Sequence, residues 1–303
     1  MPADFKAGFV AVVGKPNVGK STLMNALLGQ QVAAVSAKPQ TTRRNQLGIL
    51  SEQDSQIIFV DTPGLHREHN KLGSLMNEQA LFALEDGDVV LFLVDSSQPP
   101  TEEDRALAGK VAARRSRRPV LLALNKVDLL GPAEVRGRRA EFETLAPTEK
   151  TLEISATQGS GLPDLLAAIR ERLPRGEAYY PNDQVTDVFE RQIGADLIRA
   201  AAMGRLRDEV PFGIDVRIDR YVERGEQGAL IEATLFVERE SHKGIVIGEG
   251  GQMIKEIGKR ARKEIEAMSQ RKVFLDLRVK VKANWRDDET ALEQFGYGRR
   301  KDK

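Results

Sequence analysis

Short apolar runs alternate with amphipathic stretches through the first half of the chain. The runs at Phe9–Val13, Val89–Asp95 and Pro119–Leu124 contain almost no polar residue, which is typical of strands buried on both faces of a parallel sheet. The stretches with helical periodicity lie at 22–28, 75–84 and 162–173. This alternation predicts an α/β domain with a mostly parallel sheet and helices on both faces.

The second half has a different pattern, in which apolar and polar positions alternate. Gly213–Ile218 and Val273–Val281 show this period of two, Ala229–Val237 is a further strand, and Thr186–Ala202 has the pattern of a long helix. Together with two short helices around a glycine corner, these elements predict an α-β-β-α-α-β order. A Pro- and Gly-bounded stretch with two tyrosines separates the halves and is expected to pack on a domain surface. We predict a first domain at 1–174, a linker at 175–185, and an α+β domain with a C-terminal tail at 186–303.

Composition excludes several kinds of chemistry. The 303 residues include no cysteine, which excludes disulfides, cysteine-ligated zinc, iron–sulfur clusters and thiol catalysis. No apolar run approaches the ~20 residues of a membrane span, so we expect a cytoplasmic protein. Residues 241–303 carry 16 Lys and Arg against 10 Asp and Glu, a net charge of +6, although the whole chain carries only +1. This asymmetry favours a polyanionic partner for the second half, with a solvated basic surface as the alternative.

Residues Gly14–Ser21 match G-x-x-x-x-G-K-[ST], the phosphate-binding P-loop, between a predicted strand and a predicted helix. Glycines allow close backbone approach, and the N–H groups and the helix dipole then point at one phosphate. Lys20 would reach the β- and γ-phosphates, and the Ser21 hydroxyl would bind Mg²⁺. The candidate nucleotide ligands here are Gly14, Lys15, Pro16, Asn17, Val18, Gly19, Lys20, Ser21 and Thr22.

A D-x-P-G motif follows the predicted strand that ends at Val60. A carboxylate at the end of a buried strand beside a P-loop is the usual second Mg²⁺ anchor, and the Gly64 N–H would contact a γ-phosphate. Alone, the motif is also an ordinary turn, but its distance from the P-loop favours the nucleotide site. The candidate residues are Asp61, Thr62, Pro63, Gly64 and Leu65.

An N-K-x-D motif follows the predicted strand 119–124. Guanine presents N1–H and N2–H₂ as adjacent donors, and the Asp128 carboxylate can accept from both. With adenine that carboxylate would stay unpaired, at a cost of roughly 1–3 kcal/mol, so the motif selects GTP over ATP. The base-binding candidates are Asn125, Lys126, Val127 and Asp128, with Ser155 and the Ala156 N–H, which would meet guanine O6.

This ordered set of motifs resembles that of the translation-factor-related GTPases. The P-loop sequence, with Asn17, resembles that of their bacterial Era–Der subgroup. The resemblance implies that a threonine in the predicted loop Ser36–Arg44, Thr41 or Thr42, completes the Mg²⁺ shell. It also implies K⁺ near Asn17. Leu65 stands where Ras-like enzymes carry glutamine and cannot orient water, so intrinsic hydrolysis is expected to be slow. The catalytic candidates are Lys20, Thr42 and Gly64.

The corner Gly248–Gly251 lies between predicted helices and matches G-x-x-G. A lone G-x-x-G is weak and also suits a helix–turn–helix corner. The surrounding order and basic charge resemble a type II KH domain, whose loop and groove hold about four unstacked nucleotides. Glu249 departs from the usual neutral or basic loop residue. The RNA-binding candidates are Ile247, Gly248, Glu249, Gly250, Gly251, Ile254, Lys255 and Lys259, whereas the lone Trp285 is expected to be core.

A GTPase domain followed by a KH domain resembles the Era family. The resemblance implies GTP hydrolysis, binding of 16S ribosomal RNA near its 3′ end, action in 30S subunit assembly, peripheral association with the inner membrane, and a monomer. Two alternatives remain open. One is a sibling GTPase acting in tRNA modification or large-subunit assembly, and the other is a P-loop metabolic kinase with an accidental G-x-x-G.

Overall fold

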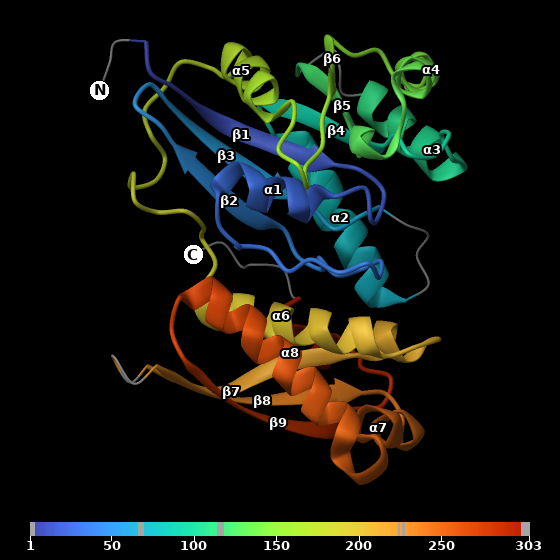
Figure 1. Cartoon of the computed structure of the whole chain (residues 1–303), viewed down its shortest axis with the longest axis vertical. Helices are drawn as coiled ribbons and strands as arrows, with labels where there is room; N and C mark the ends of the chain where they lie inside the picture. Colours follow the sequence, from blue (N-terminus) through green and yellow to red (C-terminus); the bar gives the residue numbers. More distant parts are fainter. Residues whose placement is uncertain (1–3, 66–69, 114–117, 224, 226–227, 298–303) are drawn as a thin grey trace. The chain divides into compact units, whose positions relative to one another are not determined.

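The computed structural model describes residues 4–65, 70–113, 118–223, 225 and 228–297 (Figure 1). The chain forms two compact units. The first contains most residues up to Asp187, and the second contains those from Val188 onward together with residues 34–41 and 70–75. Each unit has a sheet and a hydrophobic core of its own.

The first unit is built on a sheet whose described strands have the order β2-β3-β1-β4-β5-β6. Neighbouring strands are parallel except for the β2–β3 pair. The strands are β1 (Lys6–Val13), β2 (Gln46–Ser51), β3 (Ser55–Asp61), β4 (Val89–Asp95), β5 (Val120–Asn125) and β6 (Lys150–Glu153). Because β1, β3, β4 and β5 run in one direction, their carboxyl ends meet at one edge of the sheet, where ligands bind in open α/β folds.

Helices cover both faces of this sheet, as the sequence predicts (Figure 1). On one face, α1 (Lys20–Leu28) and α5 (Leu162–Arg172) pack on β-strand side chains such as Val10 and Val12. On the other face lie α2 (Lys71–Asp86), α3 (Glu102–Ala112) and α4 (Pro132–Glu143). The α4 helix was not predicted, and its long-range packing depends on few side chains, with only Val135 and Phe142 buried.

The second unit places three helices on one face of a sheet with the strand order β7-β8-β9. The β7–β8 pair is antiparallel and the β8–β9 pair is parallel. The elements are α6 (Glu190–Arg205), β7 (Asp215–Glu223), β8 (Ala229–Val237), α7 (Glu240–Ile247), α8 (Gln252–Ser269), β9 (Val273–Val281) and α9 (Glu289–Gln294). This α-β-β-α-α-β order agrees with the prediction.

Two details of the predicted second half were wrong. The α8 helix has 18 residues and is not short. The α6 helix begins at Glu190 and not at Thr186. The residues ahead of it have other partners, since Asp187 Oδ1 accepts from the Leu47 N–H at 3.3 Å and the Thr186 carbonyl accepts from Gln184 Nε2 at 3.1 Å.

The predicted linker packs on the first unit through one buried amide side chain. Gln56 Oε1 accepts from the N–H groups of Tyr179 at 2.8 Å and Tyr180 at 3.0 Å, and its Nε2 donates to the Tyr180 carbonyl at 2.8 Å. Further along, the Ile49 N–H on β2 donates to the Val185 carbonyl at 2.8 Å. The linker therefore lies along the β2 side of the sheet.

Trp285 belongs to the core of the second unit, as predicted. Its side chain is fully buried, and its indole N–H donates to the Gly213 carbonyl at 3.0 Å. Phe295 meets the indole edge to face at 5.2 Å between ring centroids, and Tyr297 stacks at 6.4 Å. Phe295 also contacts Phe236 on β8, so residues 285–297 pack against the sheet at this strand.

We predict that Trp285→Ala lowers the free energy of unfolding of the second unit by about 3–5 kcal/mol, because it leaves a cavity and an unpaired carbonyl. Trp285→Phe keeps most of the volume and loses chiefly the indole hydrogen bond, so it costs about 1 kcal/mol. Urea unfolding followed by circular dichroism measures both. Equal losses for the two variants would contradict a packing role for the indole.

Candidate nucleotide site and nucleic-acid groove

The P-loop joins β1 to α1 at the carboxyl edge of the first sheet. Gly19 caps α1 with φ of 102°, a conformation that glycine adopts without strain. A Cβ on Gly19 would lie 2.4 Å from Asn125 Nδ2, so the absence of a side chain also lets the β5 loop approach. The motif thus depends on glycine for both its turn and its contact with the base-binding loop.

Lys20 is buried and directed back over the P-loop. Its Nζ donates to the Gly14 carbonyl at 2.9 Å and to the Lys15 carbonyl at 3.0 Å. Burial lowers the pKa of Lys20 to about 8, against the opposing effect of the Asp61 carboxylate. Burial in turn raises the pKa of Asp61, while Lys20 and the neighbouring hydroxyl groups oppose that rise. An anion beside Lys20 would restore its full charge.

Three oxygen-bearing side chains converge beside the P-loop. Ser21 Oγ donates to Asp61 Oδ2 at 2.6 Å, and Thr42 Oγ1 lies 2.9 Å from Ser21 Oγ and 3.3 Å from Asp61 Oδ2. Asp61 Oδ1 is buried and has no hydrogen-bond partner among the described residues. Thr41 is oriented differently, since its hydroxyl donates to the Lys38 carbonyl at 2.8 Å. The geometry therefore distinguishes the two threonines that the sequence left open.

This donor set fits Mg²⁺. Mg²⁺ prefers oxygen ligands, keeps several waters, and is usually bound by one or two carboxylates together with substrate phosphates. No group of three or more His, Cys, Asp or Glu that could hold a metal occurs among the described residues. The protein offers one carboxylate, in which Asp61 Oδ1 is buried without a partner among the described residues, and two hydroxyl groups. The remaining Mg²⁺ ligands would come from the nucleotide phosphates and water.

The D-x-P-G loop closes tightly on the P-loop. A Cβ on Gly64 would lie 2.7 Å from the Pro16 nitrogen, so only glycine fits there without displacement. The Thr62 hydroxyl donates to the Val12 carbonyl at 2.8 Å and fixes the loop to β1. Leu65 is partly buried and packs against the hydrophobic core on the α2 face.

Asn125 connects the base-binding loops. Its Nδ2 donates to the Val18 carbonyl at 2.8 Å, and its Oδ1 accepts from the Ala156 N–H at 3.0 Å. The predicted O6 donor Ala156 thus bonds to Asn125 in this structure. Asp128 is exposed at the loop, and Ser155 turns the chain through its hydroxyl, which accepts from the Gln158 N–H at 3.1 Å.

Lys126 connects its loop to the P-loop and also to Asp95, a residue that the sequence did not indicate as part of the site. Its Nζ donates to the Asn17 carbonyl at 3.0 Å and pairs with Asp95 Oδ2 at 2.5 Å. Partial burial alone would raise the pKa of Asp95, but the bonds from Lys126 and Ser97 hold it below its usual value. The missed signal is the position of Asp95, which ends the strand next to β5.

A second missed contact supports the P-loop from α3. Lys15 Nζ pairs with Asp104 Oδ2 at 2.7 Å and donates to Thr101 Oγ1 at 3.2 Å. Thr101 and Asp104 form the capping box of α3, at the helix start where the sequence shows an N-cap residue and an acidic first turn. The same carboxylate therefore caps a helix and holds a P-loop side chain.

In the second unit, the G-x-x-G corner joins α7 to α8. Gly248, Gly250 and Gly251 all have positive φ, of 73°, 56° and 77°. A Cβ on Gly250 would meet no atom within 4 Å, so the surface above it is open. Glu249 is exposed in the loop.

A groove of about 410 Å³ lies between α8 and β9. Ile254, Lys255 and Lys259, three of the predicted RNA-binding residues, line it. The sequence analysis missed the other lining residues, which are Gly258, Arg262, Leu275 and Leu277. Helical spacing from Lys255 indicates Gly258 and Arg262, whereas the period of two in β9 leaves open which of its faces meets α8. The floor is apolar and the helix side is basic, as a groove for unstacked bases requires.

Family models match both halves of the chain. A model described as "50S ribosome-binding GTPase" matches residues 9–126, and a model described as "KH domain" matches residues 209–286. The first covers the P-loop, the D-x-P-G motif and the start of N-K-x-D. The second covers the sheet of the second unit, the G-x-x-G corner and the groove.

Relatives match over nearly the whole length. The chain is 44% identical to GTPase Era of Geobacter metallireducens over 97% of this chain and 98% of that protein. It is 43% identical to GTPase Era of Halothermothrix orenii over 97% and 99%. A crystal structure of Era with MgGDPNP and nucleotides 1506–1542 of 16S ribosomal RNA matches with a TM-score of 0.90 and 39% identity, over 97% and 99%. A structure of a variant of Aquifex aeolicus Era bound to GDP·AlF4⁻ also matches with a TM-score of 0.90 and 39% identity, over 97% and 100%. With these matches and this arrangement of motifs, the chain belongs to the Era family of GTPases.

Proposed function

We propose that the first unit binds and hydrolyses GTP with the residues described above, and that the second unit binds 16S ribosomal RNA near its 3′ end. The observation that carries the first part is the convergence of Ser21, Thr42 and Asp61 beside the P-loop, next to the loop that presents Asp128. An Era structure with a magnesium-bound GTP analogue and RNA supports the pairing of the two ligands.

The chemistry follows from the positions of the chain's own groups. Mg²⁺, when bound, would neutralise charge on the β- and γ-phosphates, and Ser21, Thr42 and Asp61 would hold it directly or through water. Lys20 would leave the carbonyls of Gly14 and Lys15 for the phosphates, where its charge stabilises the transferring group. The Gly64 N–H would contact the γ-phosphate, so that loss of this phosphate would release the D-x-P-G loop and the loop that carries Thr42.

Leu65 has no polar atom that could orient the attacking water, and its partly buried side chain packs against the core on the α2 face. We propose that a K⁺ ion beside Asn17 supplies part of the positive charge. Asn17 has φ of 65° and its carbonyl accepts from Lys126, so the residue is held in a fixed left-handed turn at the mouth of the P-loop.

The second unit supplies the RNA-binding function. Positive charge on the α8 side, an apolar floor and an open G-x-x-G backbone are the features by which KH domains bind single strands. We propose that nucleotide exchange in the first unit alters RNA binding by the second during 30S subunit assembly, with the protein acting as a monomer. A peripheral contact with the inner membrane remains an implication of the family resemblance. No described helix is long and apolar enough to cross a bilayer.

We predict that Asp128→Asn lowers the affinity for GTP by at least tenfold, because an amide cannot accept from both guanine donors. Xanthosine triphosphate carries a carbonyl where guanine has the N2 amine, and the new amide can donate to it. Its affinity is therefore expected to rise. Titration calorimetry with GTP and with xanthosine triphosphate measures the two affinities. A loss of affinity for both nucleotides would indicate a damaged fold.

Replacing K⁺ by Na⁺ at constant ionic strength is expected to lower the hydrolysis rate severalfold while GTP binding stays nearly unchanged. The reason is that a larger cation with a flexible shell fits the Asn17 turn and acts only on the transition state. Phosphate release at saturating GTP measures this. Equal rates in the two salts would remove K⁺ from the mechanism.

Gly250→Asp is expected to weaken RNA binding at least tenfold, because it places a carboxylate where the phosphates approach. Gly250→Asn is the matched control, since asparagine has a similar shape, tolerates positive φ and carries no charge. Filter binding in fixed salt compares the two. If both variants bind as well as the unmodified chain, the loop does not contact RNA.

A further inference from the structure

Arg199 on α6 is a charged side chain buried in the second unit. It is 2% exposed, and its guanidinium pairs with Asp196 at 2.7 Å and with Asp215 at 3.4 Å. Two carboxylates offset the cost of burying this cation, because a charge inside a protein needs partners. Burial alone would lower the pKa of Arg199, but its acidic neighbours, with Asp196 the strongest, raise it above its ordinary value. The side chain is therefore a permanent cation.

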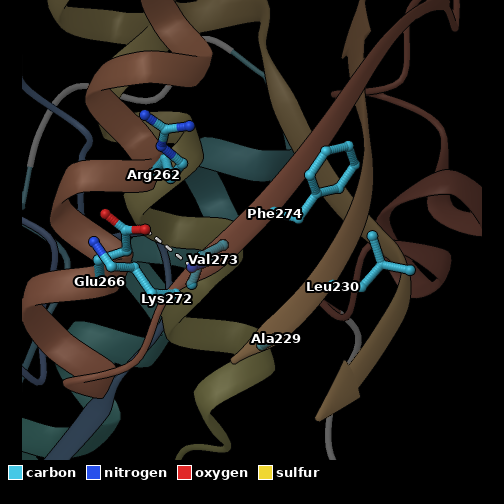
Figure 2. A pocket seen from close by; sticks show the side chains of 7 residues that line it. All are labelled: Ala229, Leu230, Arg262, Glu266, Lys272, Val273 and Phe274. Atoms are coloured by element: carbon cyan, nitrogen blue, oxygen red, sulfur yellow. Dashed lines mark hydrogen bonds between the residues drawn. The ribbon is translucent and has the colours of Figure 1, made fainter. Parts of the chain in front are cut away.

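Arg199 also reaches a segment that is far from it in sequence. A local contact in the same unit is shown in Figure 2, where the Glu266 carboxylate accepts from the Val273 N–H at 3.0 Å and fixes the start of β9. Arg199 Nη2 instead donates to the Thr41 carbonyl at 2.9 Å, across 158 positions of the chain. The guanidinium is planar and has five donors, so it can keep both carboxylates and still hold this carbonyl.

The segment that Arg199 reaches, residues 34–41, packs with the second unit. Ala34 at its start is 5% exposed and belongs to the hydrophobic core into which α6 packs. Thr41 at its end is held by Arg199, and its hydroxyl donates to the Lys38 carbonyl at 2.8 Å. The second unit therefore fixes both ends of this segment.

The next residue, Thr42, belongs to the nucleotide site. Its hydroxyl oxygen lies 2.9 Å from Ser21 Oγ and 3.3 Å from Asp61 Oδ2. Thr41 and Thr42 share one planar peptide unit, and their Cα atoms lie about 3.8 Å apart across it. Because Arg199 fixes the carbonyl of this peptide, it restricts where the Thr42 side chain can lie.

We propose that Arg199 is a positioning residue for GTP hydrolysis. By holding the Thr41 carbonyl, it keeps the Thr42 hydroxyl beside Ser21 and Asp61, where Mg²⁺ would bind. The inference rests on the proposed Mg²⁺ ligation by Thr42 and extends it to a residue outside the nucleotide-binding motifs. Removing a group that orients a metal ligand typically costs about 10–100-fold in metal affinity or activity.

The test measures Mg²⁺ binding directly. A fluorescent, non-hydrolysable GTP analogue is bound to the full-length chain, and Mg²⁺ is titrated at fixed ionic strength. Arg199→Lys keeps the charge that Asp196 and Asp215 require but lacks the planar fork, so it is expected to raise the half-saturating Mg²⁺ concentration about tenfold. With GDP the same variant is expected to have no effect, because the loop that carries Thr42 would then be released.

A double variant asks whether Arg199 acts through Thr42. Thr42→Ala is expected to raise the Mg²⁺ requirement by itself, and adding Arg199→Lys to it is expected to change nothing further. Additive effects of the two substitutions would overturn the inference. So would an effect of Thr42→Ala that Arg199→Lys does not share. If Thr42→Ala leaves the Mg²⁺ requirement unchanged, the proposed ligation by Thr42 is wrong and the inference falls with it.

Arg271→Lys is the matched control. Arg271 lies in the same unit and also pairs with two carboxylates, those of Glu190 at 2.6 Å and Glu223 at 3.1 Å. None of the bonds described for it reaches residues 34–42. Both lysine variants are expected to lower the urea midpoint of unfolding, but only Arg199→Lys should change Mg²⁺ binding. An equal rise in the Mg²⁺ requirement for both would make lost stability the cause and would contradict a positioning role.

Hydrogen exchange of the unmodified chain tests the anchor without any variant, which matters if Arg199→Lys does not fold. Peptides that cover residues 34–42 are expected to be protected in the complex with Mg²⁺ and the GTP analogue, because the second unit holds both ends of residues 34–41. Exchange of these peptides at the rate of an unstructured loop would overturn the inference.

Discussion

The side-chain amide of Asn125 is the interaction on which the nucleotide site depends. One carboxamide donates to the P-loop at Val18 and accepts from the loop after β6 at Ala156. It thereby fixes three loops that follow three different strands. The lack of a side chain at Gly19 leaves room for it. Because both of its polar atoms are used inside the protein, Asn125 sets the distance between the phosphate-binding and base-binding loops before any ligand arrives.

Much of the first unit can be predicted from sequence because its chemistry lies in contiguous motifs. The P-loop, D-x-P-G and N-K-x-D each follow a buried strand, and the parallel sheet brings the ends of those strands together. Contacts that depend on tertiary packing could not be predicted from contiguous motifs. Asp95 and Asp104 meet Lys126 and Lys15 across the loops, and no spacing in the sequence links either pair. Arg43 lies in the predicted polar loop and is nevertheless 1% exposed, which hydropathy does not foresee.

In the second unit, periodicity predicted the elements better than their functional faces. The alternation in β9 shows that successive side chains point to opposite sides, but it does not show which side α8 covers. The packing of α8 on β9 is therefore needed to assign Leu275 and Leu277 to the groove. Gly258 was missed for a related reason. Glycine weakens a helix in isolation, yet a Cβ there would lie 3.5 Å from Leu277, and its small size keeps the groove floor open.

The packing of the linker along β2 has a consequence for self-association. β2 ends the order of the first sheet, and an unpaired strand edge is a template for pairing with another chain. The bond from Ile49 to Val185 occupies part of that edge, and the Gln56 bonds to Tyr179 and Tyr180 hold the linker in place. The segment that joins the two units thus also covers an edge strand. It therefore limits aggregation in addition to connecting the units.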